Sequence, residues 1–127
     1  MFGSKKENSN WYKEHVNDEY VKKATEAGYK SRAAFKLTEI DDRYSVRKGN
    51  KHILDLGCAP GSWLQVLSKR ADKTCKILGI DKEDMNLPLL DSDSRISFIK
   101  GDITDKSTMI KITEFFDCNK LDMIVSD

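Results

Sequence analysis

The pattern of hydrophobic and polar positions changes character near residue 50. Before that point it predicts two amphipathic helices. The first is expected over 19–27, with Asp18 as its N-cap and Gly28 at its end. The second is expected to begin at a Ser31 cap and to end before Lys48-Gly49-Asn50. Apolar residues recur at helical spacing along it and predict one buried stripe made of Ala33, Leu37, Ile40 and Tyr44.

Beyond residue 51 short apolar runs alternate with helical patterns. Strands are predicted over 53–56, 76–80, 96–99 and 121–125, and helices over 62–70 and 107–116. This alternation predicts an α/β fold with a doubly wound, mostly parallel sheet. The fourth strand would be central in such a sheet and would need another neighbour. We therefore expect these residues to form only the first part of the sheet, about four strands.

Length and composition narrow the class of protein. A chain of 127 residues that is 39% hydrophobic and 34% charged suits one small soluble domain. No apolar run reaches the roughly 20 residues of a membrane helix, and residues 1–20 have no signal-peptide pattern. The cysteines Cys58, Cys75 and Cys118 form no CxxC or Cys/His cluster, so we expect no disulfide framework, no metal site and an intracellular compartment.

Charge is distributed unevenly along the chain. Residues 1–51 hold 12 Lys and Arg against 8 Asp and Glu, whereas residues 52–127 hold 10 against 13. A basic head on a mildly acidic body favours a polyanionic partner that approaches one side. Candidate phosphate contacts are Lys22, Lys23, Lys30 and Arg32.

The strongest local signal is the segment 55–63, Asp-Leu-Gly-Cys-Ala-Pro-Gly-Ser-Trp, at a predicted strand–turn–helix junction. Glycines at 57 and 61 allow a sharp turn and close approach of the backbone to a ligand. The N-terminus of the following helix favours a carboxylate or phosphate. The candidate cofactor-binding residues of this segment are Asp55, Gly57, Ala59, Pro60, Gly61 and Trp63. We expect Trp63 to pack beside the cofactor rather than to stack on a base.

Acidic residues follow three consecutive predicted strands: Asp81, Asp102 and Asp127. The carboxyl ends of strands in open α/β sheets are where ligands bind, and an acid 20 residues after Gly61 suits ribose hydroxyls. The glycines do not spell G-x-G-x-x-G, which disfavours a nicotinamide cofactor and favours S-adenosylmethionine. Its ribose would lie at Asp81, its adenine edge at Asp102 and its methionine carboxylate at the glycine turn.

With these residues in place, the chain resembles the FtsJ/RrmJ family of RNA ribose 2′-O-methyltransferases from about residue 11 to 127. Two blocks carry the resemblance: residues 29–37, Tyr-Lys-Ser-Arg-Ala-Ala-Phe-Lys-Leu, and residues 55–63, with their Pro-Gly-x-Trp ending. The resemblance implies a Rossmann-like class I methyltransferase sheet of seven strands. It also implies a Lys-Asp-Lys-Glu catalytic set.

Within that set the first Lys would be Lys36 and the Asp would be Asp127, which also counts among the cofactor-binding residues. The second Lys and the Glu would lie beyond residue 127. We expect Lys36 to lie at the edge of the buried stripe of its helix, between core and solvent. Its stem would be buried and its ammonium would reach a cleft. We expect Phe35 to face away from the stripe and to pack against the helix over 19–27.

The substrate follows from residues 11–21, which look like the first segment of the branch that methylates large-subunit ribosomal RNA, although Glu19 replaces the usual Pro. His15 is expected to be a packing or capping residue. The implied function is 2′-O-methylation of ribosomal RNA, at a uridine of the large subunit, by a monomeric protein whose partner is ribosomal RNA or the large subunit. The compartment would be the cytoplasm of a bacterium, or the mitochondrion or another organelle of a eukaryote.

Two alternatives stay open: a transfer RNA methyltransferase of the same family, and a non-catalytic methyltransferase-like factor for ribosome assembly. A nicotinamide oxidoreductase fails on the glycine spacing. Whichever of these RNA-related functions is correct, we expect residues 1–50 to form a helical, basic, RNA-facing extension of the domain. Residues 51–127 are expected to form its cofactor-binding half.

Overall fold

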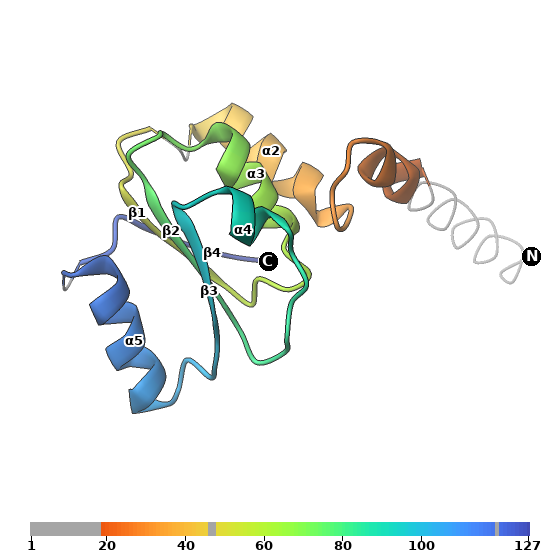
Figure 1. Cartoon of the computed structure of the whole chain (residues 1–127). Coiled ribbons are helices and arrows are strands. Elements are labelled where there is room, and N and C mark those ends of the chain that lie inside the picture. Colours follow the sequence, from red (N-terminus) through yellow and green to blue (C-terminus); the bar gives the residue numbers. More distant parts are fainter. Residues whose placement is uncertain (1–18, 46–47, 119) are drawn as a thin grey trace, which may run out of the picture.

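A computed structural model of the chain describes residues 19–45, 48–118 and 120–127. Its centre is a four-stranded parallel sheet in the order β3-β2-β1-β4 (Figure 1). The strands are β1 (His52–Leu56), β2 (Lys76–Asp81), β3 (Ile96–Lys100) and β4 (Met123–Ser126). The chain steps outward from β1 to β3 and then returns to the other side of β1. This return creates a topological switch point between β1 and β4, the place where open α/β sheets bind ligands.

Helices cover both faces of the sheet, as a doubly wound fold requires. On one face lie α2 (Ala33–Tyr44), α3 (Ser62–Arg70) and the short α4 (Leu89–Ser92), and on the other lies α5 (Lys106–Phe116) (Figure 1). Residues 19–26 form a further helix beside the start of α2, and Gly28, at a φ of 81°, follows its end. The predicted α/β fold with its parallel sheet is confirmed.

The core has two layers because β1 and β2 are buried on both faces. Alternate strand residues point to opposite sides. One layer packs under α2 and α3 and includes Leu37, Ile53, Leu64 and Ile77. The other packs against α5 and includes Leu54, Leu78, Ile112 and Phe116. The two-sided burial explains why these strands are near-continuous apolar runs in the sequence.

The buried stripe of α2 differs from the predicted one. Its buried residues are Ala34, Leu37 and Asp41, whereas Ile40 is 36% and Tyr44 71% exposed. The reason is polar: Asp41 accepts a hydrogen bond of 2.9 Å from Arg70 of α3. The helix therefore turns its Asp41 face toward α3, and of the predicted stripe only Leu37 is fully buried, with Ala33 partly covered.

Caps and boundaries differ from the predicted ones in other places too, and most boundaries shift by a single residue. Ser31 does not cap α2, because its hydroxyl donates to the Ser62 hydroxyl at 2.9 Å and α2 begins at Ala33 without a side-chain cap. The sequence pattern does not predict the α4 turn, since four residues carry too little periodicity. The fourth strand begins at Met123 rather than at 121. The predicted cap at Asp18 and the predicted role of His15 lie outside the described residues.

Phe35 packs as predicted. Its ring centroid lies 6.1 Å from that of Tyr20, in the helix over 19–26, and 6.0 Å from that of Tyr29.

In the described part of the chain β4 pairs with β1 alone, and its Ile124 is 56% exposed. None of the helices within the described ranges has the length and apolar character needed to cross a membrane.

Candidate functional site

The ends of three strands meet at one edge of the sheet. Leu56 is paired in register with Ile80 on one side and with Ser126 on the other. The next residues along the chain, Gly57, Asp81 and Asp127, therefore lie at the same level at this edge of the sheet. The topology thus brings together the glycine loop and two of the three predicted acids at the switch point.

The glycine loop is tied to β2 and shaped by its glycines. The backbone N–H groups of Gly57 and Cys58 both donate to the carbonyl of Ile80, at 2.8 and 3.1 Å. Gly61 precedes α3 with a φ of 109°, and a Cβ there would lie 2.9 Å from a methyl of Leu87. Only glycine suits that position.

Trp63, in the first turn of α3, is 6% exposed. Its indole N–H donates to the carbonyl of Ala33 at 2.7 Å, and so it links α3 to α2 beside the loop. Trp63 is thus a buried packing residue beside the loop, and its predicted contact with a cofactor remains a prediction.

Asp81 is held by backbone donors on both oxygens. It accepts from Ala59 N–H and from Glu83 N–H, each at 2.9 Å. A carboxylate has about four acceptor sites, so these contacts orient Asp81 and leave it able to accept hydroxyl donors. A cleft of about 320 Å³ opens beside it, lined by Leu56, Gly57, Ile80, Asp81, Lys82, Glu83, Gly101 and Ile103. Its apolar walls and its acid suit a nucleoside.

Asp102 closes a turn at the rim of this cleft. One carboxylate oxygen accepts from the backbone N–H and hydroxyl of Thr104, and the other lies 3.3 Å from the Lys82 ammonium. These Thr104 hydrogen bonds, with Lys82, lower the pKa of Asp102. Its neighbours Gly101 and Ile103 line the cleft. The predicted contact of Asp102 with an adenine edge remains a prediction.

Asp55 is the most unusual group of the site. It is 1% exposed on β1, and within the described part of the chain its Oδ2 has no hydrogen-bond partner. Burial, with the negative charges of Asp127 and Asp81, raises its pKa to about 7. A buried acceptor without a donor is costly, so its position on β1, just before the glycine loop, is consistent with a donor or cation supplied by a ligand.

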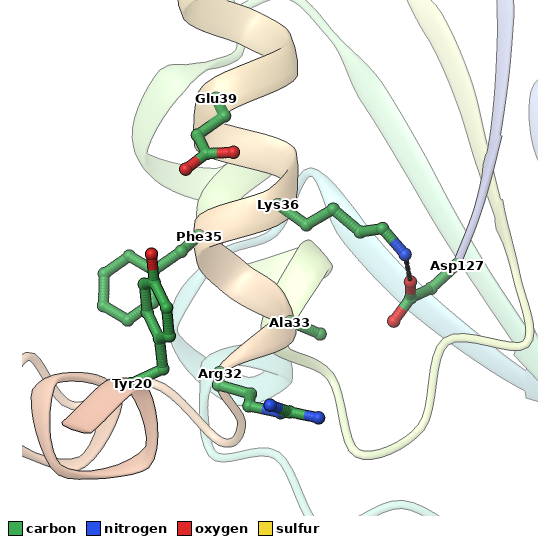
Figure 2. A pocket seen from close by; sticks show the side chains of 7 residues that line it. All are labelled: Tyr20, Arg32, Ala33, Phe35, Lys36, Glu39 and Asp127. Carbon is green, nitrogen blue, oxygen red and sulfur yellow. Dashed lines mark hydrogen bonds and ion pairs between the residues drawn. The ribbon is translucent and has the colours of Figure 1, made fainter. Parts of the chain in front are cut away.

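Lys36 and Asp127 form an ion pair across 91 positions of sequence. Lys36 Nζ donates to Asp127 Oδ1 at 3.0 Å, from α2 to the residue after β4 (Figure 2). Both predicted catalytic residues therefore meet. The Lys36 side chain is 65% exposed, so its stem is not buried as predicted, because the face of α2 that packs on α3 is the Ala34–Asp41 face.

The pair lies in a pocket of about 340 Å³, lined by Tyr20, Arg32, Ala33, Phe35, Lys36, Glu39 and Asp127 (Figure 2). A smaller pocket of about 50 Å³ shares Ala33 and Asp127 with it and shares Gly57 with the cleft beside Asp81. Asp55, Pro60 and Trp63 also line the smaller pocket. The three hollows are thus neighbours in a row along the sheet edge, with Asp127 between the Lys36 pocket and the glycine loop.

The four predicted phosphate contacts are all exposed: Lys22, Lys23, Lys30 and Arg32. Arg32 lines the Lys36 pocket, and Lys30 lines a further hollow beside Ala59 and Pro60. The Lys23 ammonium lies 5.8 Å from the centre of the Tyr20 ring. Arg32 and Lys30 therefore lie beside the hollows, and contact of all four cations with RNA remains a prediction.

Sequence reasoning missed several residues that line the hollows: Tyr20, Ser31, Glu39, Ile80, Lys82 and Ile103. Ile80 and Lys82 flank a predicted strand-end acid and could have been found from that position. Tyr20 and Glu39 carry no local signal, since only the packing of the first helix against α2 brings them together. The cysteines are free, and the described residues hold no cluster of three or more His, Cys, Asp or Glu placed to bind a metal.

Comparison with known proteins assigns the family. The family model for FtsJ-like methyltransferases matches residues 29–127. The chain belongs to the FtsJ-like methyltransferase family. The resemblance inferred from residues 29–37 and 55–63 is confirmed, as is the class of fold.

Individual relatives are similar over most of this chain. A protein named ribosomal RNA large subunit methyltransferase E from Pseudomonas fluorescens is 38% identical over 92% of the chain and 54% of its own length. A protein of the same name from Francisella tularensis is 37% identical over the same shares. A crystal structure assigned as a ribosomal RNA methyltransferase, from Plasmodium falciparum, has a TM-score of 0.63 at 40% identity and covers 78% of this chain and 56% of its own. The chain thus spans about half the length of these relatives.

Proposed function

We propose that the protein is an S-adenosylmethionine-dependent methyltransferase that modifies ribose 2′-hydroxyls of ribosomal RNA, at a uridine of the large subunit. The observation that carries this proposal is the Lys36–Asp127 ion pair of 3.0 Å. The pair lines a pocket next to the glycine loop. A ribose hydroxyl in that pocket would therefore lie close to the methyl donor bound at the loop.

The residues at the sheet edge fit the proposed cofactor. Asp81 would accept the ribose hydroxyls in the cleft. The buried Asp55, whose Oδ2 has no donor among the described residues, would face the positively charged part of the methionine end. Gly57 has a φ of 70°, and no atom lies within 4 Å of the position that a Cβ would take, which leaves room for close approach of a ligand. When bound, S-adenosylmethionine supplies a methyl group activated by its sulfonium.

Lys36 would act on the acceptor. Its ammonium can donate a hydrogen bond to the ribose 2′-oxygen and stabilise the negative charge that develops there as the proton is lost. Asp127 would accept one hydrogen bond of the ammonium and so orient Lys36, whose other N–H groups would be left for the ribose oxygen. Positioning of the hydroxyl in line with the methyl donor would supply much of the remaining acceleration. The proton would pass to a base, for which the resemblance implies the second Lys of the set, supported by its Glu.

Ribosomal RNA as the substrate is supported by the names of the relatives and by the exposed cations around the pocket. Lys22, Lys23, Lys30 and Arg32 would contact phosphates and position the RNA without reading its sequence. We propose that the protein acts as a monomer, in the cytoplasm of a bacterium or in an organelle of a eukaryote.

The test uses the full-length protein, tritiated S-adenosylmethionine and separate pools of large subunits, free ribosomal RNA and transfer RNA. We expect alkali-stable 2′-O-methyl dinucleotides in large-subunit RNA. In the Lys36→Ala variant we expect kcat to fall by about a hundredfold or more, because a charge that stabilises the transition state is lost. Lys111→Ala, an exposed lysine on α5, is the matched control and should retain wild-type activity.

Other outcomes would contradict the proposal in distinct ways. Label confined to transfer RNA would show that the substrate class is wrong. Cofactor binding with no label in any pool would favour a non-catalytic factor for ribosome assembly. Full activity in Lys36→Ala would remove the ion pair from the mechanism.

A further inference from the structure

The Lys36 pocket has an aromatic side that the proposed methyl transfer does not use. Its lining includes Tyr20 and Phe35 in addition to the Lys36–Asp127 pair (Figure 2). Tyr20 comes from the helix over 19–26, and its ring lies beside that of Phe35, at 6.1 Å between centroids with an interplanar angle of 48°. Tyr20 is 39% exposed, so part of this aromatic surface is open to a ligand.

The aromatic surface is held in place from behind. The Phe35 ring meets the Tyr29 ring edge to face, at 6.0 Å and 79°. Tyr29 in turn carries the Lys69 ammonium 4.4 Å from its ring centre. Phe35 therefore lies between two aromatic rings, and of the two rings that line the pocket Tyr20 is the more exposed.

One face of α2 forms the floor of the pocket between its two sides. Arg32, Lys36 and Glu39 recur at intervals of four and three residues, so they lie on the same face of the helix. Phe35 is displaced from Lys36 by about 100° around the helix axis. Figure 2 shows the aromatic pair on one side of this face and the Lys36–Asp127 pair on the other. A ligand that covers the face would thus contact both pairs.

The charges in the lining argue against a phosphate as the occupant of the aromatic side. Two cations, Arg32 and Lys36, are matched by two anions, Glu39 and Asp127. A pocket with balanced charge and an aromatic wall suits a neutral, planar ring with a polar attachment. An unstacked nucleobase with its ribose has this chemistry, and proteins commonly stack such bases on aromatic side chains.

We propose that Tyr20, supported by Phe35, binds the base of the nucleotide whose ribose lies at Lys36 and Asp127. This inference rests on the proposed methylation of RNA ribose and adds a positioning residue to it. It follows that the substrate nucleotide enters the pocket unpaired and unstacked, and that a base-paired target nucleotide is methylated only after it leaves its helix.

The test is a cycle that combines a protein variant with removal of the base, carried out in the full-length protein once the methylated nucleotide has been mapped. Wild type and Tyr20→Leu are each assayed on RNA with the target base present, and on RNA with an abasic ribose at that position. Loss of one base–aromatic contact should lower kcat/KM about five- to a hundredfold. Tyr20→Phe keeps the ring and serves as the matched variant, with kcat/KM within about twofold of wild type.

We expect Tyr20→Leu and the abasic substrate to cause similar losses, and their combination to cause little more than either alone, because both remove the same contact. The affinity for S-adenosylmethionine, measured by calorimetry, should be the same in Tyr20→Leu and wild type. Losses that multiply would overturn the inference, because Tyr20 would then act on folding or RNA docking and not on the base. Wild-type kcat/KM in Tyr20→Leu would overturn it as well.

These outcomes are separable from failure of the proposed function. If Lys36→Ala abolishes methylation while the effects of Tyr20→Leu and base removal multiply, the proposed function stands and only the base contact is wrong. If the wild-type protein labels no RNA, the proposed function itself fails.

Discussion

Asp55 shows how a single residue connects stability with function. Its carboxyl is 1% exposed, and its neighbours Asp81 and Asp127 are also acidic. Burial and these two charges raise its pKa to about 7, well above that of an ordinary Asp. In the ligand-free protein the group is therefore a source of instability near neutral pH, which a bound cation or hydrogen-bond donor would relieve.

This pKa predicts the direction of the pH dependence of stability. Between about pH 4 and pH 7 the folded protein binds a proton that the unfolded chain has already released. The free energy of unfolding of the ligand-free protein therefore falls as the pH rises through this window, and the contribution of Asp55 is about 4 kcal/mol. Urea unfolding of wild type and Asp55→Asn at a series of pH values would measure it.

In Asp55→Asn this contribution is absent, so the variant should gain stability relative to wild type as the pH rises from about 4 to about 7. Parallel pH profiles for the two proteins would show that the Asp55 carboxyl does not retain its proton in the folded state.

At the scale of the elements, one side chain, that of Arg95, links α3, α4 and β3. The Arg95 guanidinium donates to the carbonyls of Ser68, Ala71 and Asp72, which lie at the C-terminal end of α3. It also forms a 2.7 Å ion pair with Asp93, directly after α4, and holds the pKa of that carboxyl well below its usual range. Arg95 thereby satisfies carbonyls that the helix end leaves without partners.

We predict that Arg95→Met lowers the free energy of unfolding by about 2–4 kcal/mol. The part-buried carbonyls of Ser68 and Ala71 lose a donor, and the mostly buried Asp93 loses its cation and keeps only a hydroxyl and a backbone donor. The matched control is Lys100→Met, since Lys100 pairs with Asp84 but both side chains are mostly exposed. That change should cost less than about 1 kcal/mol. Chemical denaturation of both variants gives the comparison, and equal losses would contradict the assigned role of Arg95.

At the scale of the whole molecule, exposed basic residues gather near the first helix, on the side of the Lys36 pocket. Lys22 and Lys23 belong to the helix over 19–26, and Lys30 and Arg32 lie between that helix and α2, at one end of the molecule (Figure 1). The α5 helix covers the opposite face of the sheet. RNA that enters the Lys36 pocket would therefore meet the basic end of the molecule first, which favours electrostatic guidance of the substrate.

We predict that changing Lys22, Lys23 and Lys30 to Gln weakens RNA binding and reduces the slope of log K against log salt concentration by about 2, as expected for three single-strand phosphate contacts. The control changes the same number of exposed lysines elsewhere, Lys106, Lys111 and Lys120, with the same loss of charge. Binding titrations at several salt concentrations measure both slopes. Equal slopes in the two variants would show that net charge, rather than this basic end, attracts RNA.

The strands and the longer helices could be predicted from the sequence because their signals are local. The predicted 62–70 helix is α3, and the predicted strands agree with the observed ones within two residues at each end. The glycine loop and the strand-end acids Asp81 and Asp127 could also be predicted, since parallel topology sends all carboxyl ends to one edge. The family could be recognised from residues 29–37 and 55–63 because each of these motifs is also continuous in the sequence.

Features that depend on packing between distant segments could not be predicted. The rotation of α2, which leaves Ile40 and Tyr44 exposed, results from the pairing of Asp41 with Arg70, 29 positions away. The exposure of the Lys36 stem follows from the same rotation. The aromatic side of the pocket depends on how the first helix packs on α2.

By itself, then, the sequence determined the type and order of the elements and the chemistry available at the sheet edge, because periodicity and turn residues act over a few positions. Only the tertiary structure decided which faces are buried, that Lys36 and Asp127 meet at 3.0 Å, and that, among the described residues, Asp55 Oδ2 is left without a donor. The physical reason is that burial, pairing and pKa depend on neighbours that are close in space and far apart in the chain.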